Sequence, residues 1–484
     1  MFSTIRWTAG LCVAALCGAT IAAGGELRVG TAIADLTPAE PVAVSGQFHL
    51  RIATKAETPI EASVIVLESG EEGAKRDAAV FVSCDVVVIP NEVRGLVRDA
   101  VHKQLPELDP QQIVLTATHT HTGPELDLGK YPVPKEGVMQ VEAYRAMFVA
   151  RVAAAVVEAW QRRAAGSVTW GLSHAAVACN RRAVYADGSA VMYGRTDVPE
   201  FRGFEDGADH SVQTLFVWNG EGKLAGVAVN VPCTAQEVES RSTLNADFWH
   251  PVRVALRKRH GPQLAVLGWT GAAGDQSPHP MYAKAAEERM LRLRGLTRLE
   301  ELGRRIVAAV DEAYDVVAKD RRSDVPLTHR VETLRLPMRL VSEAEYRAAQ
   351  ADCAQITAQM ERDPKAAAAV FRKREWHAET VRRFERQAAE PQPTHETEIH
   401  VVRIGEAAIC TNPFELFTEY GIRIQARSQA QQTFVVQLAG PGGYLPTERA
   451  VRGGGYSAVI HSSLVGPEGG QRLVDRTVEL INSR

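Results

Sequence analysis

Two histidines separated by a single residue stand in the segment LTATHTHTGPE, residues 115–125. On an extended chain, residues i and i+2 point to the same side, so His119 and His121 would face one cavity. Two imidazoles in one cavity suit a transition metal, above all zinc. Neighbouring histidines are also often ordinary hydrogen-bonded residues, and the spacing alone leaves both interpretations open.

A second candidate segment is GAAGDQSPH, residues 271–279, which places Asp275 and Ser277 on a glycine-rich turn. The turn follows the apolar run LAVLGW, which reads as a strand. Loops at the carboxyl ends of strands are where α/β proteins hold their sites. The alternative is a turn in which Asp275 bonds its own backbone.

Two further segments lie near the carboxyl end of the chain. In NPFELF, Glu415 follows Pro413 at the start of a predicted helix, where a carboxylate can simply favour the helix dipole. In GPGGYLPTERAVRGGGYSA, Tyr444 and Tyr456 lie in a glycine-rich stretch that brings the backbone close to a ligand. The GxxxxGK[ST] pattern of a phosphate loop is absent from this sequence.

The elements that must position these residues alternate between short β-rich runs and amphipathic helices. This alternation predicts an α/β fold, with a mixed β-sheet core and helices packed on it. Strands are expected at 62–69, 78–88, 113–119, 167–173, 211–218, 224–231 and 264–269, and helices at 91–105, 141–163 and 247–259.

From about 342 to 391 the composition changes to Ala, Glu, Arg and Gln. Ser342 and Glu345 fit a capping box at the start of this segment. We interpret it as a protruding helical hairpin. A solvated insertion is the favoured role, and a dimerisation arm or a substrate lid are the alternatives.

Composition and the amino terminus restrict the class of protein. The chain has 484 residues with 55 basic and 58 acidic side chains, so nothing supports nucleic acid as a partner. Residues 1–23 read as a secretory signal peptide, which predicts a secreted or periplasmic protein. An uncleaved anchor and a lipoprotein at Cys17 are weaker alternatives. The remaining five cysteines are expected to be core residues rather than a disulfide framework.

Taken together and in order, these segments resemble the neutral ceramidases, zinc amidases that cut the amide of N-acylsphingosine. VGTAIADLTP and VSGQFHL resemble the family's opening strand and loop, and THTHTGP resembles its THTHSGP. GDQSPH resembles GDxSPN, NPFELF resembles PGEF, and GGY…GGY resembles the terminal tyrosine pair. The resemblance implies one ceramidase-like catalytic domain over residues 24–484.

The resemblance also implies roles for individual residues. His119, Glu415 and Tyr444 would bind zinc, and His121 would bond the substrate or the attacking oxygen as the general acid or base. Tyr456 and Arg181 would stabilise the oxyanion that forms on the amide carbonyl. Ser277 matches the family's essential serine, for which orientation of water is favoured over covalent attack, and Asp275 would hold its turn.

One correspondence fails at the position of the family's second zinc histidine. After AGVAVNV this chain reads PCTAQEVES, so Thr234 or Gln236 takes that place. Gln236 is the candidate metal ligand, with water alone or His250 from the next predicted helix as alternatives. His279 stands where the family has asparagine.

Three functions remain open on this evidence. The leading one is a secreted zinc-dependent hydrolase of a lipid or small-molecule N-acyl amide, which leaves room for peripheral membrane contact. The second is a zinc hydrolase of another ester, lactone or N-acyl substrate. The third is a metal-free, non-catalytic binding domain, for which the missing histidine is the argument. The sequence does not decide the oligomeric state.

Overall fold

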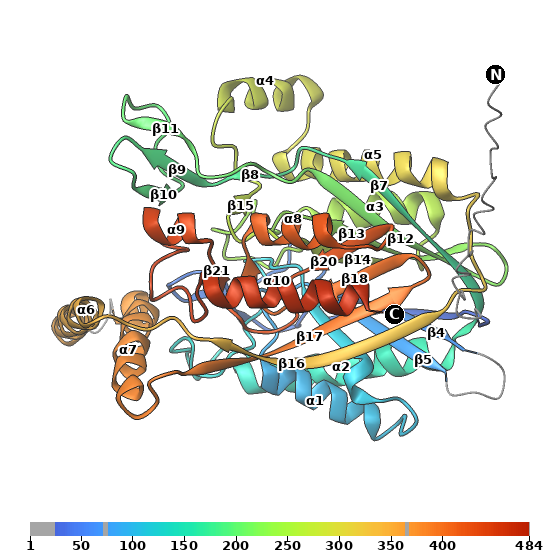
Figure 1. The fold of residues 1–484 in the computed structure, drawn as a ribbon, viewed down its shortest axis with the longest axis horizontal. Coiled ribbons are helices and arrows are strands. Elements are labelled where there is room, and N and C mark those ends of the chain that lie inside the picture. Colours follow the sequence, from blue (N-terminus) through green and yellow to red (C-terminus); the bar gives the residue numbers. More distant parts are fainter. Residues whose placement is uncertain (1–24, 71–75, 364–366, 484) are drawn as a thin grey trace, which may run out of the picture.

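An eight-stranded mixed β-sheet forms the centre of the fold in the computed structural model, which describes residues 25–70, 76–363 and 367–483 (Figure 1). The pairs β5–β6 and β13–β14 are parallel and the other neighbours are antiparallel. In spatial order the strands are β14 (Ala265–Thr270), β13 (Leu224–Val231), β12 (Ser211–Asn219), β7 (Ala164–His174), β1 (Arg28–Asp35), β4 (Glu61–Ser69), β5 (Asp77–Cys84) and β6 (Ile113–Ala117).

A four-stranded sheet packs face to face on this central sheet. Its strands are β16 (Leu327–Pro337), β17 (Thr394–Ile404), β18 (Ala407–Thr411) and β20 (Gln432–Val436). Ile65, Phe81 and Trp269 of the large sheet share one buried cluster with Val402 and Phe434 of the small one. Because both faces of the large sheet are covered, its strands are nearly continuous apolar runs, and all nine residues of β4 are buried.

Helices cover the two outer faces and give the fold four layers (Figure 1). The large sheet packs against α1, α2, α3 and α5, and the small sheet packs against α8 and α10. Their bounds are α1 (Asn91–His102), α2 (Val141–Gln161), α3 (Trp249–His260), α5 (Arg298–Val317), α8 (Thr418–Arg427) and α10 (Pro467–Asn482). The predicted α/β class with a mixed sheet core and packed helices is confirmed.

The predicted helical hairpin is also confirmed, as α6 (Glu343–Arg362) and α7 (Ala367–Ala389). It stands out from one end of the molecule (Figure 1), and the Ser342–Glu345 capping box is present. One side of α7 is buried, however, so the hairpin is not a solvated arm all round. Arg383 donates to the Ile460 carbonyl oxygen at 2.7 Å, which fastens α7 to the body.

The remaining strands and α-helices are short. They are β2 (Val42–Val44) with β3 (Arg51–Ala53), β8 (Cys179–Asn180) with β15 (Gln276–Ser277), β19 (Glu415–Leu416) with β21 (Tyr444–Leu445), the three-stranded set β9 (Arg182–Tyr185), β10 (Ala190–Met192) and β11 (Phe201–Phe204), and the helices α4 (Lys284–Arg294) and α9 (Glu448–Gly453).

Several element boundaries differ from the sequence prediction: the strand expected at 113–119 ends at Ala117, and the helix expected at 91–105 ends at His102. The strand expected to reach residue 88 ends at Cys84, and the helix expected from 247 begins at Trp249. The five cysteines are free thiols, and Cys84, Cys233 and Cys410 are buried as predicted for core residues, whereas Cys179 and Cys353 are only partly buried. Within the described ranges no helix is long and apolar enough to cross a bilayer. The predicted signal peptide lies outside the described residues.

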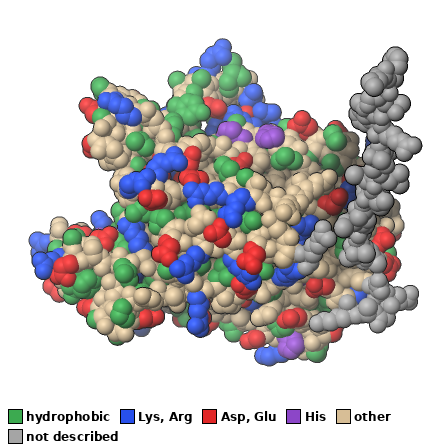
Figure 2. All heavy atoms as spheres, viewed as in Figure 1, with side chains coloured by type: hydrophobic (Ala, Val, Ile, Leu, Met, Phe, Trp, Pro, Cys, Tyr) green, Lys and Arg blue, Asp and Glu red, His purple; other side chains and the backbone are tan. Residues whose placement is uncertain are grey.

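The face of the molecule in Figure 2 carries basic and acidic side chains interspersed with one another. A surface of this kind agrees with the nearly balanced composition of 55 basic and 58 acidic residues.

Candidate active site

The two histidines lie in the turn that follows β6, and their rings meet as predicted. The ring centroids are 4.8 Å apart, and the two Nε2 atoms are 3.2 Å apart. The prediction gave an extended chain as the reason, and this is wrong: His119 has a φ of 64°, in the left-handed region. Its backbone N–H still bonds the Val86 carbonyl oxygen, so the turn stays fixed to the end of β5.

His119 is held with one ring nitrogen turned to the cavity. Its Nδ1 lies 2.8 Å from the Val87 carbonyl oxygen, which can only accept, so we assign the proton to Nδ1. Nε2 is then a bare acceptor and lies 3.5 Å from Glu415 Oε2. A ring oriented by a backbone carbonyl in this way is typical of a metal-binding histidine.

Glu415 and Tyr444 are neighbours because the two short strands β19 and β21 run parallel and pair these residues directly. The prediction that Glu415 stands at the start of a helix is therefore wrong, since α8 begins only at Thr418. Burial opposes ionisation of Glu415, but His119, when its ring is protonated, and Arg181 outweigh it and hold the pKa of the carboxyl below its usual range. Burial and the Glu415 charge raise the pKa of the Tyr444 hydroxyl.

Gln236 lies beside the histidines with its amide oxygen turned away from them. The oxygen accepts from Thr234 Oγ1 at 2.6 Å and from Arg181 Nη1 at 3.2 Å. The amide nitrogen lies 2.7 Å from His121 Nε2 and donates to it. To bind a metal through oxygen, the amide of Gln236 would have to turn over and lose both of these bonds.

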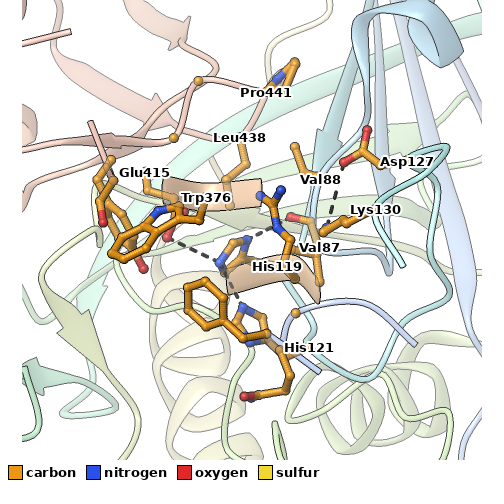
Figure 3. A pocket seen from close by; sticks show the side chains of 18 of the residues that line it. Val87, Val88, His119, His121, Asp127, Lys130, Trp376, Glu415, Leu438 and Pro441 are labelled. Atoms are coloured by element: carbon orange, nitrogen blue, oxygen red, sulfur yellow. Dashed lines mark hydrogen bonds and ion pairs between the residues drawn. The ribbon is translucent and has the colours of Figure 1, made fainter. Parts of the chain in front are cut away.

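A cavity of about 320 Å³ opens in front of these groups (Figure 3). His119, His121, Glu415, Tyr444 and Tyr456 line it, so five of the predicted site residues share one space. The remaining wall comes from Phe48, Lys130, Tyr131, Arg372, Trp376 and backbone around Gly442, among others. Trp376 belongs to α7, and Figure 3 shows it near Glu415 and His119.

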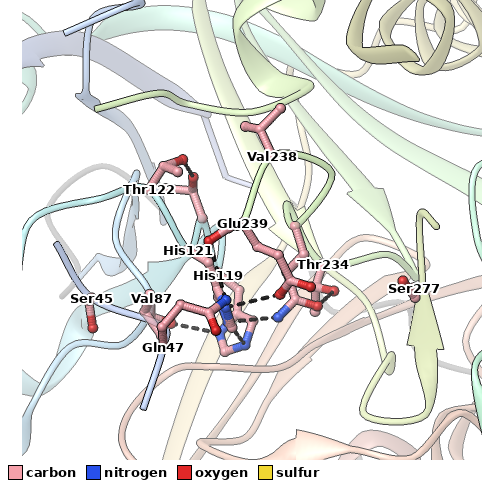
Figure 4. Close-up of polar contacts among 12 residues, drawn as sticks. Ser45, Gln47, Val87, His119, His121, Thr122, Thr234, Val238, Glu239 and Ser277 are labelled. Atoms are coloured by element: carbon pink, nitrogen blue, oxygen red, sulfur yellow. Dashed lines mark hydrogen bonds and ion pairs between the residues drawn. The ribbon is translucent and has the colours of Figure 1, made fainter. Parts of the chain in front are cut away.

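Ser277 and Asp275 do not line this cavity. Ser277 is fully buried and stands apart from the histidines (Figure 4), where its Oγ lies 3.0 Å from the Tyr193 hydroxyl and accepts from the His279 backbone N–H. Asp275 accepts from the backbone N–H and hydroxyl of Thr418 and from the Asn180 amide. It joins three segments, which is more than the local turn that sequence suggests.

Arg181 connects the residues that line the cavity with those around Ser277 and Asp275. Its guanidinium donates to the Tyr444 hydroxyl at 3.2 Å, to the Tyr193 hydroxyl at 3.3 Å and to the Gly274 carbonyl oxygen at 3.0 Å. The side chain is buried and does not line the cavity. Any effect of Arg181 on a substrate would therefore pass through Tyr444, or through Gln236 and His121.

Besides Trp376 and Arg372 of the cavity wall, sequence reasoning missed two residues that contact the predicted site residues. Glu239 Oε2 lies 3.3 Å from His121 Nδ1, and its other oxygen lies 3.6 Å from His279 Nε2. Burial lowers the pKa of His121 to about 4, so the imidazole is neutral. Tyr193, which bridges Ser277 and Arg181, is the second. Glu239 lies in PCTAQEVES, the segment in which a metal ligand was sought at Thr234 or Gln236, whereas Tyr193 stands in no recognisable pattern.

The side chains at this site provide some, but not all, of the ligands that a metal cation needs. Nε2 of His119 is bare, and Oε2 of Glu415 is buried with no hydrogen-bond partner in the described residues. Their separation of 3.5 Å is close to the roughly 3.4 Å between ligands bound about 2.1 Å from a tetrahedral zinc. Yet no three His, Cys, Asp or Glu side chains in the described ranges are grouped to hold a metal. Tyr444 is the third donor at hand.

His250 does not supply the missing imidazole. It lies in the first turn of α3, and the charged groups that act on it are Arg253, Glu61, Asp85 and Arg257. It is not among the residues that line the cavity.

The fold is similar to that of two solved neutral ceramidase structures. The chain superimposes on the crystal structure of neutral ceramidase from Pseudomonas aeruginosa with a TM-score of 0.65 and 18% identity, over 94% of this chain and 74% of that one. A structure described as ceramidase complexed with C2 gives a TM-score of 0.66 and 17% identity, over 94% and 75%.

Comparisons of sequence add no further relative. No family model matches this chain, and no curated protein matches it. At this level of identity the structural likeness establishes the fold, which confirms the resemblance read from the sequence.

Proposed function

We propose that this protein is a metal-dependent hydrolase of an N-acyl amide. The observation that carries the proposal is the pair formed by bare His119 Nε2 and unpaired Glu415 Oε2, 3.5 Å apart in the wall of a cavity. Two acceptors that face each other require a proton or a metal cation between them. The ceramidase fold supports the amide as the substrate class.

His119, Glu415 and Tyr444 would hold the metal, and zinc is the ion that this mixture of nitrogen and oxygen donors suits. When bound, zinc would supply Lewis acidity and a nucleophilic water near neutral pH. Gln236 remains a candidate only through rotation of its amide. In the orientation found here it instead fixes His121 by donating to its Nε2.

The remaining residues would handle protons and developing charge. His121 is neutral, is held between Gln236 and Glu239, and faces the cavity, so it would accept and return a proton. Tyr456 lines the cavity with a hydroxyl whose pKa is raised by burial and by Glu415, so it stays protonated and would donate to the oxyanion. Arg181 would support Tyr444.

For Ser277 we propose a positioning role. Its hydroxyl reaches Tyr193 and not the cavity, and His279 places its ring Nε2 2.8 Å from the Gln236 carbonyl oxygen. No base therefore faces Ser277 among the described residues. Ser277→Ala is expected to lower the rate through Tyr193 and Arg181, with no covalent acyl intermediate trapped in the wild-type protein.

The proposal further includes export, with removal of residues 1–23, and action on N-acyl compounds outside the cytoplasm. Amino-terminal sequencing of exported protein should find a start near Gly24. Retention of Met1 would contradict it.

The test of the function is a substrate panel at fixed acyl length, with an amide, an ester and a lactone, assayed with added zinc and with chelator. We expect zinc-dependent release of the amine from the amide, and a loss of at least about 100-fold in His119→Ala. Preference for the ester or lactone would favour the second function considered above. Tight binding of an amide without hydrolysis or zinc uptake would establish the metal-free binding domain.

A further inference from the structure

The helical hairpin supplies one wall of the cavity through α7. Trp376 packs its ring 5.6 Å from Phe48 and 5.8 Å from Tyr456, measured between ring centroids. The three rings come from three distant parts of the chain and form an aromatic wall beside His119 and Glu415. A wall of this kind favours an apolar or planar part of a ligand.

The hairpin is fixed in this position by contacts to the segment that carries Tyr456. Thr380 Oγ1 lies 2.6 Å from His461 Nδ1, and Arg383 donates to the Ile460 carbonyl oxygen at 2.7 Å. The Trp376 ring also stacks at a tilt on His461, with centroids 4.7 Å apart. Trp376 is therefore held as part of the cavity, and the hairpin acts on whatever the cavity binds.

The same helix brings into the cavity a cation that forms no direct ion pair, although the Asp127 carboxylate, which also lines the cavity, acts on it over a longer distance. Arg372 lines the cavity one turn before Trp376, and its guanidinium has no ion pair or hydrogen bond with the described residues. The other lining cation, Lys130, is satisfied: its Nζ lies 3.1 Å from Glu125 Oε2, 3.0 Å from Ser45 Oγ and 3.8 Å from Asp127 Oδ2.

A free guanidinium beside an aromatic wall is suited to a carboxylate on a partly apolar molecule, because the planar fork of donors matches the two carboxylate oxygens. The cavity volume of about 320 Å³ lies at the low end of the roughly 300 to 1,000 Å³ of small-molecule sites. It has no room to enclose a lipid with two long chains.

We propose that the substrate is an N-acyl amino acid, whose acyl chain lies against Trp376, Tyr456 and Phe48 and whose carboxylate binds Arg372. This inference rests on the proposed amide hydrolase function and names its substrate class. In the reaction, water oxygen bonds to the amide carbonyl carbon, the carbon–nitrogen bond breaks, and the nitrogen takes the proton that water gives up. The products are a fatty acid and a free amino acid.

The test compares N-octanoylglycine with N-octanoylglycinamide, which differ only in the charge of the terminal group, and includes N-octanoylsphingosine. The value of kcat/KM should be about 10- to 100-fold higher for the glycine compound than for either neutral one, the usual range for a charge-assisted hydrogen bond. In Arg372→Gln the ratio between the first two should fall to about one, mainly through a lower kcat/KM for the glycine compound.

The matched control is Lys373→Gln, which removes the same charge from an exposed neighbouring position on α7 and should keep the wild-type ratio. Arg372→Lys should give an intermediate ratio. Trp376→Ala should raise KM for both compounds alike. Circular dichroism and thermal unfolding establish that each variant is folded.

Equal rates on the charged and neutral compounds in the wild type, or a preference that survives Arg372→Gln, would overturn the inference. If no amide is hydrolysed, the proposed function fails, and calorimetry still decides the inference. Binding of N-octanoylglycine that weakens about tenfold or more in Arg372→Gln would support it, and binding that is absent or unchanged would refute it.

Discussion

Replacement of Gly46 by alanine is expected to disable the site, although no residue with a proposed catalytic role is itself replaced. Gly46 has a φ of 101°, and a Cβ atom there would lie 2.5 Å from Cγ and 2.8 Å from Nδ1 of His121. Ordinary contact between carbon atoms is about 3.5 to 4.0 Å. The His121 ring would therefore have to move by about 1 Å, away from Glu239 and Gln236.

A displacement of about 1 Å in a catalytic group costs on the order of 100-fold in rate, or about 2.7 kcal/mol in the activation barrier. The left-handed backbone adds about 1–2 kcal/mol of strain, which lowers the free energy of unfolding. We therefore expect Gly46→Ala to lose about 100-fold in kcat/KM and about 1–2 kcal/mol in stability.

Gly188→Ala is the control that separates the two effects. Gly188 has a φ of 83°, with nothing within 4 Å of the added Cβ. It should show the same loss of stability, measured by urea unfolding, at unchanged kcat/KM. If the two variants keep the same activity, either His121 has no part in the reaction or the cavity tolerates its displacement, and the reasoning is refuted.

Three further predictions concern polar residues that lie outside the cavity. Burial lowers the pKa of His329 to about 3 and also lowers that of His400, to which it is hydrogen-bonded, so both are neutral when folded. In the unfolded chain both histidines bind a proton near pH 6.5. The free energy of unfolding should therefore fall as pH drops from about 6.5 towards 3, by up to about 1.4 kcal/mol per pH unit for each histidine. A urea midpoint that stays constant over this range would contradict the prediction. Arg253→Met leaves the buried Asp85 carboxylate without its partner at 3.0 Å and should cost about 3–5 kcal/mol; a shift below about 1 kcal/mol would count against the pair. Asp275→Asn sets an amide nitrogen opposite the Asn180 amide and should cost about 1–3 kcal/mol and lower activity, whereas wild-type stability would show that the network is dispensable.

The secondary structure that could be read from the sequence was the part governed by local pattern. The apolar run of β4, the amphipathic α1 and the capping box at Ser342 depend on residues close in sequence, and all three are found. The strand predicted over 78–88 was too long because apolar residues continue past Cys84 into a buried loop.

The site could be predicted only where residues fall within short motifs. His119, Glu415 and Tyr444 were identified in this way and do meet, although Glu415 is placed by a two-residue parallel pairing that no local pattern predicts. Glu239, Tyr193, Trp376 and Arg372 reach the site through contacts between distant elements. Glu239 lies in the PCTAQEVES segment that the resemblance points to, but nothing in the residues around Tyr193, Trp376 and Arg372 distinguishes them from surface or core positions.

The central claim is most directly tested by zinc stoichiometry, measured by elemental analysis after purification without chelator and by titration of the apoprotein. The account predicts one zinc per chain in the wild type, loss of it in His119→Ala, and full retention in His250→Ala, whose imidazole lies outside the cavity. A wild-type protein that neither contains nor takes up zinc would contradict the metal site, and equal losses in the two variants would contradict the placement of its ligands.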